Sequence, residues 1–490
     1  MPVNLMPSAT DYLRILPEII MTVAGTLIML IEGWLSGQHK KWNLSALTFI
    51  AFVAALVAAV VANGHQGVSF ANMFIVDGFA TFFRVLVIAV GILSLLSAVQ
   101  YLKREHAESA EYYALLLFSV TGQCIMATAN ELIMIFIGLE ISSIATYILA
   151  GYLRDDKRNN EAALKYFLLG SFATAFLFYG IAWIYGTTGS TNLAVIRNVL
   201  LAPGGSDRNT LLAGTAAALM FVGFAFKVTA APFQIWAPDV YQGAPAPVTL
   251  FMSAGPKAVA FAVFLRVFMT AFGPITSRWE PFVWSSALLT MIIGNFAALM
   301  QTNIKRLLAY SSIAHAGYVM VAIAAHNQIG IAAAMFYLAA YALMNIGAFA
   351  VITHFSRQGE KYVNIEDLAG LGWKQPVTAG LFAIFLLSLI GVPLTGGFFG
   401  KFYIFKAALD ANLVWLAVLG MLNSAVAAYY YLRILVVMYM NEPGEATLSI
   451  QPVGAGIATT LWVTAVGTLL LGIYPTVLLN FATYSSALVK

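Results

Sequence analysis

Residues 224–262 decide the fold of this chain and read FAFKVTAAPFQIWAPDVYQGAPAPVTLFMSAGPKAVAFA. Two apolar runs meet in this stretch, and each carries a lysine, Lys227 in the first run and Lys257 in the second. Lys257 lies about ten residues into its run, hence about 15 Å along a helix and near the middle of a bilayer about 30 Å thick. Because a charge at that depth costs at least about 2.5–3.5 kcal/mol, the stretch predicts membrane-spanning helices whose buried charges serve a function.

The composition of the whole chain agrees with this prediction. Of 490 residues, 61% are hydrophobic and 9% are charged, whereas about 25% are charged in a soluble globular domain. The apolar blocks have the length of a membrane-spanning helix and lack the alternating polarity of barrel strands. We predict an all-α integral membrane protein with about 14 transmembrane helices. The predicted spans are 13–36, 42–63, 72–98, 111–129, 131–152, 161–186, 211–236, 247–272, 281–302, 307–326, 330–356, 377–409, 412–440 and 452–480.

The sequence offers no site for a cofactor. The single cysteine, Cys124, cannot by itself hold an iron–sulfur cluster or a disulfide framework. No dinucleotide-binding glycine pattern follows a strand, and no Cys/His cluster has the spacing of metal ligands. Because the aromatic residues have no accompanying basic face, they suit contact with the lipid bilayer rather than with nucleic acid. We therefore expect no cofactor, metal or nucleic acid to bind this chain.

Basic residues in the connections predict the orientation of the chain, because short cytoplasmic loops carry an excess of Lys and Arg. The odd-numbered connections hold twelve such residues: Lys40, Lys41, Lys103, Arg104, Arg154, Lys157, Arg158, Lys305, Arg306, Arg357, Lys361 and Lys374. The even-numbered connections and the termini hold five: Arg14, Arg197, Arg208, Arg278 and Lys490. Both termini are therefore predicted to lie outside the cytoplasm.

Two of the spans are predicted to be broken helices. Span 211–236 carries Lys227 followed by Pro232, and span 377–409 is too long for one straight crossing and contains GVPLTGG just before Lys401. Such breaks persist in a membrane only where protein or a water-filled cavity satisfies the freed backbone groups. Paired interruptions are typical of transporters built from two repeats.

The spacing of polar residues supports such a repeat. Three pairs recur at nearly one offset: Lys227 and Lys401 are 174 residues apart, Glu140 and His315 are 175 apart, and Lys257 and Arg433 are 176 apart. The offset corresponds to five spans, and an odd number of crossings inverts the second copy. We therefore expect three N-terminal helices in 1–110, a first five-helix repeat in 111–272, an inverted second repeat in 281–440 and a C-terminal helix in 452–490.

The central charges are the candidate functional residues. Glu140, Lys227, Lys257 and Lys401 are too deep to reach the surface comfortably, and burial makes the proton of a lysine easier to release. His315 extends this set because imidazole titrates near neutral pH. These groups could relay protons across the membrane.

Other charges have a plausible structural explanation. Lys165, Arg266 and Lys406 lie near span ends, so their side chains could reach the interface. Asp77 and Arg84 are seven residues apart on one helix face and could form a structural pair. Lys165 nevertheless stays among the candidates for the relay.

The opening stretch closely resembles the antiporter-like membrane subunits of bacterial NADH:quinone oxidoreductase, respiratory complex I. The run PDVYQGAP followed by Pro256 and Lys257 is typical of the N branch of that family rather than the M and L branches. Further matching segments are LIMIFIGLEISSIATYILAGY at 132–152, EAALKYFLLGSFATA at 161–175, NIKRLLAYSSIAHAGY at 303–318 and GVPLTGGFFGKFYIF at 391–405. The resemblance covers roughly residues 110–440.

The resemblance implies a role for each candidate. Glu140 and Lys227 match the family's acid–base pair that tunes proton affinity, and Lys165 matches the lysine near that pair. Lys257 matches the central lysine, His315 the connecting histidine and Lys401 the terminal lysine of the path.

The resemblance also implies a function and partners. We expect a proton-translocating subunit of the bacterial inner membrane that is bound to other membrane-arm subunits. FMN, iron–sulfur clusters, NADH and quinone would belong to other subunits of the complex. Two alternatives stay open, namely a subunit of a multisubunit cation/proton antiporter and a passive structural subunit of the membrane arm.

Overall fold

The computed structural model describes residues 7–35, 43–202 and 207–488, and helices dominate these ranges. The helices before the expected repeats are α1 (Ala9–Arg14), α2 (Leu16–Leu35), α3 (Leu44–Asn63) and α4 (Gly78–Arg104). A short antiparallel pair, β1 (Gly67–Ser69) and β2 (Phe74–Val76), connects α3 to α4. Then follow α5 (Ala110–Thr128), α6 (Leu132–Ala150), α7 (Lys157–Thr188), α8 (Leu193–Leu201), α9 (Asp207–Val228), α10 (Trp236–Gly243) and α11 (Ala246–Arg266).

The second half of the chain continues in the same manner. Its helices are α12 (Thr276–Leu299), α13 (Ile304–Ala324), α14 (Gln328–Phe355), α15 (Leu371–Lys374), α16 (Pro376–Ile390), α17 (Gly396–Asp410), α18 (Val414–Met440), α19 (Glu445–Leu448), α20 (Ala455–Ile473) and α21 (Pro475–Ser485). Four short turns of π- or 3-10 helix join them: η1 (Val267–Ala271), η2 (Gly273–Ile275), η3 (Gln358–Glu360) and η4 (Glu366–Leu368).

The expected all-α membrane fold is confirmed. Among the described residues, 11 helices are long and apolar enough to cross a membrane. Two further predicted spans correspond to α2 and α5, of 20 and 19 residues. The long predicted span 377–409 consists of α16 and α17, 15 residues each, with a break between them. The chain is therefore a multi-pass membrane protein.

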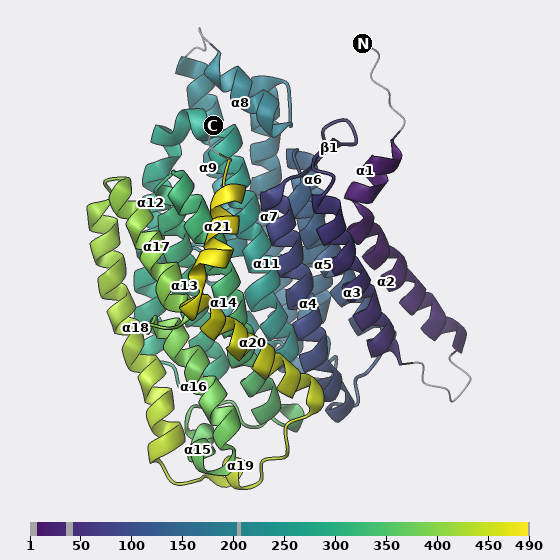
Figure 1. The fold of residues 1–490 in the computed structure, drawn as a ribbon, viewed down its shortest axis with the longest axis vertical. Coiled ribbons are helices and arrows are strands. Elements are labelled where there is room, and N and C mark those ends of the chain that lie inside the picture. Colours follow the sequence, from purple (N-terminus) through teal and green to yellow (C-terminus); the bar gives the residue numbers. More distant parts are fainter. Residues whose placement is uncertain (1–6, 36–42, 203–206, 489–490) are drawn as a thin grey trace.

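Figure 1 shows the arrangement of these helices. α2 and α3 lie at one edge of the bundle and α18 at the other, while α20 crosses the face nearest the viewer obliquely. α1 and α8 lie toward the upper end, whereas α15 and α19 lie at the opposite end. The interior belongs to α11, α13 and α14, whose apolar stretches are each 94% buried. Polar side chains on these three helices are thus the ones best shielded from lipid.

The internal repeat can be traced in the backbone. Hydrogen bonds join the entrance of α6 to the segment after α7, and corresponding bonds join the entrance of α13 to the segment after α14. The first pair is Leu132 N to Thr191 O and Leu193 N to Asn130 O, and the second is Ile304 N to Val363 O and Ile365 N to Thr302 O. Each residue of the second pair follows its counterpart by 172 positions.

Close helix packing repeats at the same offset. A Cβ added to Gly122 of α5 would lie 2.6 Å from the backbone nitrogen of Ser142 on α6, and one added to Gly294 of α12 would lie 2.5 Å from that of Ala314 on α13. Because both glycines and both partners are 172 residues apart, the α5–α6 and α12–α13 pairs share one register.

This register corrects the repeat alignment expected from the polar residues. An offset of 172 aligns Glu140 with Ser312 and Ser143 with His315, so the predicted match of Glu140 with His315 was wrong by about one helical turn. Arg433 differs from the buried Lys257 in its surroundings, since it is partly exposed and lies 3.5 Å from a carboxylate oxygen of Glu366.

Several other charges occupy places that the sequence did not predict. Asp77 and Arg84 were expected to pair, but in the described chain each binds another residue. Arg84 binds Glu18 at 2.7 Å, and Asp77 binds Arg266 at 2.9 Å. Lys305 is fully buried rather than a loop residue. Of the other residues in the orientation count, Lys40, Lys41 and Lys490 lie outside the described residues.

Candidate functional site

Lys227 lies at the end of α9, beside the first break. Its ammonium donates hydrogen bonds to Ser143 Oγ at 2.7 Å and Tyr147 Oη at 3.1 Å, both on α6. The ring centroids of Tyr147 and Tyr166 lie 5.0 and 5.6 Å from its Nζ. A hydroxyl can accept from an ammonium and donate to an amine. These partners therefore suit either protonation state of Lys227.

Hydroxyl groups of α12 form hydrogen bonds with the backbone of the break that follows Lys227. Thr229 has a positive φ of 63°, which ends α9. The backbone nitrogen of Ala231 donates to Thr290 Oγ1 at 2.7 Å, and Ser286 Oγ donates to the Ala231 carbonyl at 2.5 Å. Protein side chains thus satisfy backbone groups that a helix would otherwise pair, as the membrane interior requires.

Lys257 lies at the centre of the molecule on α11, 2% exposed. Its ammonium donates to Thr229 Oγ1 at 2.9 Å, to the Ser312 carbonyl at 2.9 Å and to the Ser312 hydroxyl. Tyr341 of α14 donates to the same Ser312 hydroxyl at 2.7 Å. Because Thr229 begins the first break, two residues after Lys227, the break itself contacts the central lysine.

His315 lies on α13, about one turn beyond Ser312, and is 2% exposed. Its Nδ1 is 2.5 Å from Tyr337 Oη, and its Nε2 is 3.2 Å from Tyr431 Oη. Its ring also lies 5.3 Å from the ring of Tyr341. Since a hydroxyl faces each ring nitrogen, either neutral tautomer of His315 can be hydrogen-bonded.

Lys401 lies just beyond the second break, at the start of α17. Its ammonium donates to the carbonyls of Leu389 and Ile390, both at 2.9 Å, and to Ser424 Oγ at 2.8 Å. The two carbonyls end α16, where the helix dipole favours a positive charge. Gly391, with φ of 96°, turns the chain there.

These groups form a polar row through the protein. Hydrogen bonds and ring contacts join its members from Thr229 to Lys401, and Lys227 precedes Thr229 by two residues in the chain. Tyr318 completes the row, because its ring lies 5.6 Å from the His315 ring and 4.8 Å from Lys401 Nζ. The polar row consists of Lys227, Thr229, Lys257, Ser312, Tyr341, His315, Tyr318 and Lys401. The sequence predicted its four ionisable members. It missed the hydroxyl partners, because Ser, Thr and Tyr are common in membrane helices and carry no sequence signal of their own.

Glu140 and Lys165 do not join the row directly. Among the described residues, Glu140 and Lys227 form no ion pair. The carboxylate acts on the lysine through its charge alone. Lys165 binds Glu161 at 2.7 Å and Asp239 at 2.8 Å, and its side chain is 41% exposed. The structure thus places Lys165 in a surface cluster, away from the lysine that it was expected to assist.

That cluster lines a polar cavity of about 220 Å³, which we call the vestibule. Its lining residues are Arg158, Glu161, Ala162, Lys165, Asp239, Gln242, Gly243, Asn303, Arg306, Glu360 and Val363. Asp239 stands between two cations, with Arg306 at 2.6 Å and Lys165 at 2.8 Å. Burial opposes ionisation of Asp239, but the bonds and charges of these cations outweigh it and lower its pKa.

Comparison with known proteins identifies the family. Residues 129–427 match the family described as NADH:quinone oxidoreductase/Mrp antiporter, transmembrane. NADH-quinone oxidoreductase subunit N 1 of Solibacter usitatus is 62% identical over 492 aligned residues and covers 100% of both chains. The chain belongs to the subunit N family of NADH-quinone oxidoreductases. Because the alignment with this relative spans the whole chain, it includes both the polar row and the vestibule.

Solved structures agree with the subunit N assignment. A chain of respiratory complex I from Thermus thermophilus, solved with bound aureothin, has a TM-score of 0.80 and 34% identity, covering 95% of this chain and 99% of that one. A chain of the Mrp complex from Dietzia has a TM-score of 0.86 over 99% of this chain and 98% of that one, but only 20% identity. The Mrp likeness therefore shows a shared fold and no more.

Proposed function

We propose that this subunit translocates protons across the bacterial inner membrane along the polar row. The observation that carries the proposal is the placement of that row: its middle part lies on α11, α13 and α14, the most buried helices, where unpaired charge is costly. Lys227 and Lys401 lie at its two ends, beside the breaks. A proton relay needs side chains that can both accept and donate a proton or a hydrogen bond, and these side chains can do so.

The proposed sequence begins on the cytoplasmic side. Lys227 takes up a proton, and the field of Glu140 stabilises the charged form. When that stabilisation weakens, the proton passes to Lys257 and then through His315 to Lys401, which releases it on the far side. Lys165 assists uptake by holding the acid of the vestibule in place.

The driving force comes from outside the chain. Each proton moved against 100 mV requires about 2.3 kcal/mol from the potential alone. NADH oxidation and quinone reduction in partner subunits would supply it, with FMN and iron–sulfur clusters held there. The chain itself would contact other membrane-arm subunits and lipid, and would hold no redox centre. This assignment makes the protein a subunit of a proton-translocating enzyme.

The proposed topology follows from the same reading. Residues 111–272 and 281–440 would form two inverted half-channels, and both termini would face the periplasm. The vestibule then opens to the cytoplasm, because its Arg158 and Arg306 belong to the connections rich in basic residues.

Replacement of Lys227 by Ala tests translocation. The variant complex is purified and placed in liposomes, and proton translocation is measured per NADH oxidised. We expect a clear loss, whereas Lys406→Ala, which removes an exposed lysine of α17, should translocate as the wild type does. Unchanged translocation in the assembled Lys227→Ala complex would favour the passive structural subunit.

The second alternative is a multisubunit cation/proton antiporter, which would use the same residues but draw on an ion gradient. Purification of the native assembly distinguishes the two. We expect flavin-containing and iron–sulfur subunits to accompany this chain. Their consistent absence, together with proton movement driven by a sodium gradient, would support the antiporter instead.

A further inference from the structure

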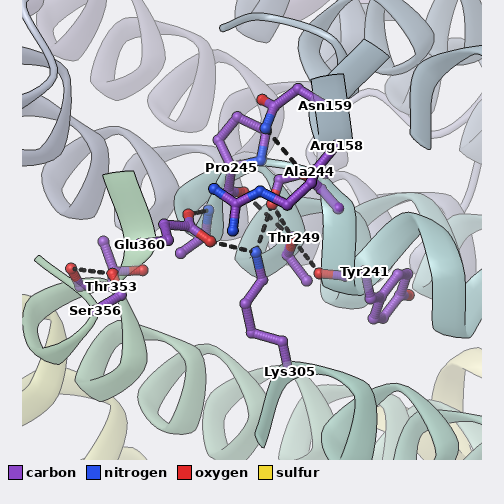
Figure 2. Close-up of polar contacts among 12 residues, drawn as sticks. Arg158, Asn159, Tyr241, Ala244, Pro245, Thr249, Lys305, Thr353, Ser356 and Glu360 are labelled. Carbon is purple, nitrogen blue, oxygen red and sulfur yellow. Dashed lines mark hydrogen bonds and ion pairs between the residues drawn. The ribbon is translucent and has the colours of Figure 1, made fainter. Parts of the chain in front are cut away.

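A second buried acid–base pair lies outside the polar row. Lys305, at the start of α13, binds Glu360 of η3 with Nζ 2.6 Å from Oε2, and the two side chains are 0% and 10% exposed. Lys305 also donates to the Ala244 carbonyl at 2.6 Å. Figure 2 shows the lysine side chain pointing toward both partners. A buried ion pair adds little net stability, because its desolvation offsets much of its attraction. Stability alone therefore does not explain this pair.

Glu360 gathers partners from distant parts of the chain. Its Oε1 accepts from the hydroxyl of Tyr101 on α4 at 2.9 Å and from the backbone nitrogen of Ala246 at 2.6 Å. Ala246 begins α11, the helix that carries Lys257. The carboxylate therefore occupies the positive end of that helix, where a negative charge is favoured.

The turn that carries Glu360 is strained and held from several sides. Arg357 and Glu360 have positive φ values of 61° and 48°, which are unfavourable in a residue other than glycine. Between them, Gly359 donates to Glu105 Oε2 at 3.1 Å and accepts from Arg158 Nη2 at 3.0 Å. Strain that neighbouring groups enforce in this way is typical of functional positions.

The pair lies between the vestibule and the polar row. On the outer side, Glu360 lines the vestibule. On the inner side, the Ala244 carbonyl that binds Lys305 is also bound by Thr249, whose hydroxyl donates to the Tyr241 carbonyl at 3.1 Å.

Tyr241 also has a side-chain hydroxyl, which is a different group from the carbonyl that Thr249 binds. This hydroxyl is buried and has no hydrogen-bond partner among the described residues. α10, which carries Tyr241, packs against α13, which carries Ser312 of the polar row. A buried hydroxyl without a partner is a group that a passing proton or water could use.

We propose that Glu360 and Lys305 form a second proton entrance, which delivers protons from the vestibule to Lys257 without passing Lys227. This proposal rests on the proposed function. It assigns to the connection between α14 and α15 a part in transport, where the sequence indicated only a polar loop.

The transfer can be written as a closed cycle. A hydronium ion in the vestibule gives a proton to the Glu360 carboxylate, which becomes neutral, and a water molecule is left. Lys305 then lacks its counter-charge in a buried site and releases its ammonium proton inward, toward Tyr241 and Lys257. The neutral carboxyl gives its proton to the neutral amine, and the original ion pair returns. One proton has moved inward, and no bond other than those to hydrogen has changed.

A purely structural ion pair makes a different prediction from a relay. We would replace both residues, as Glu360→Gln with Lys305→Met, so that no charge stays buried without a partner and the Gln carbonyl can still accept from Ala246. If the pair only holds the fold together, this neutral pair should translocate protons as the wild type does. If it relays protons, the assembled double variant should translocate fewer protons per NADH than the wild type, while the entrance through Lys227 carries the remainder.

Two comparisons make the result decisive. Glu366→Gln removes a carboxylate that is 66% exposed and lies in the same connection, and should leave translocation unchanged. Wild-type translocation in the double variant, together with a loss in Lys227→Ala, would overturn the second entrance alone. Wild-type translocation in both would overturn the proposed function itself.

A measurement on the native complex covers the case in which the double variant fails to assemble. Dicyclohexylcarbodiimide reacts with carboxyl groups that become protonated in apolar surroundings. We expect mass spectrometry of the treated complex to find an adduct on Glu360. Absence of the adduct, in a digest where the peptide is detected, would contradict protonation of Glu360.

Discussion

Gly391 is the residue whose replacement most directly tests the geometry of the second break. It ends α16 with φ of 96° and ψ of 42°. A Cβ built at this position would lie 3.2 Å from Cδ of Lys401 and 3.7 Å from its Nζ. Gly391→Ala therefore strains the backbone and pushes the lysine away from the carbonyls of Leu389 and Ile390 at the same time.

The size of the effect follows from these two terms. A left-handed conformation costs an alanine about 1–2 kcal/mol. A hydrogen bond to a charged group contributes about 1.5–3 kcal/mol net, so weakening one of the carbonyl bonds of Lys401 shifts the ratio of bound to displaced ammonium about tenfold or more. We expect translocation per NADH to fall clearly, with moderate loss of the assembled complex.

The same helix provides a control. Gly380 lies inside α16 and has no heavy atom within 4 Å of an added Cβ, and alanine is favoured there by about 0.5–1 kcal/mol. Proton translocation in liposomes and the yield of assembled complex should be measured for both variants. Gly380→Ala should match the wild type. If Gly391→Ala matches it as well, Lys401 does not depend on the carbonyl contacts described above.

Three further outcomes follow from the structure. Gly122→Ala places a Cβ 2.6 Å from the backbone nitrogen of Ser142, where neither helix can yield cheaply, so native gels should show little assembled complex; normal assembly would contradict the packing described. Ser143→Ala removes one of two hydroxyls that hold Lys227, and translocation should fall between those of the wild type and Lys227→Ala. Because the pKa of Asp239 is lowered below its ordinary 3.8, its ion pairs persist above that pH and are lost only in stronger acid. Asp239→Asn should therefore reduce translocation by one constant factor between about pH 6 and 8, and a factor that changes with pH would refute this.

The spans and both breaks could be predicted because their causes are local in sequence. A run of about 20 apolar residues has to be a helix in lipid, and proline or paired glycines have to interrupt it. Lys227, Lys257 and Lys401 could be found for the same reason, since an ion inside such a run is conspicuous without knowledge of its neighbours.

The partners of these lysines could not be predicted, because they come from distant helices. Ser312 lies 55 residues from Lys257, and nothing in its own surroundings distinguishes it from other membrane serines. The repeat was aligned on ionisable residues, which gave an offset of 175 for Glu140 and His315. The backbone hydrogen bonds instead give an offset of 172 residues. The difference of three residues is nearly one helical turn, so the alignment paired Glu140 with the wrong counterpart.

Lys305 and Glu360 escaped prediction for a related reason. Both lie next to polar connections, where a charge normally faces water, so the sequence favoured exposed loop residues. Their burial results from the way the turn 357–360 folds back onto the starts of α11 and α13. Such tertiary contacts are not encoded in the composition of the loop.

The two lysines beside the breaks are held by different chemistry. Hydroxyls hold Lys227, and they can donate to a neutral amine as readily as they accept from an ammonium. Carbonyl oxygens supply two of the three contacts of Lys401, and a carbonyl can only accept. A neutral amine at Lys401 could still donate its two N–H groups to these carbonyls and accept from the Ser424 hydroxyl. The two sites therefore differ chiefly in the charged state, because the carbonyl end of the α16 dipole favours the ammonium of Lys401, whereas hydroxyls and aromatic rings contact the ammonium of Lys227.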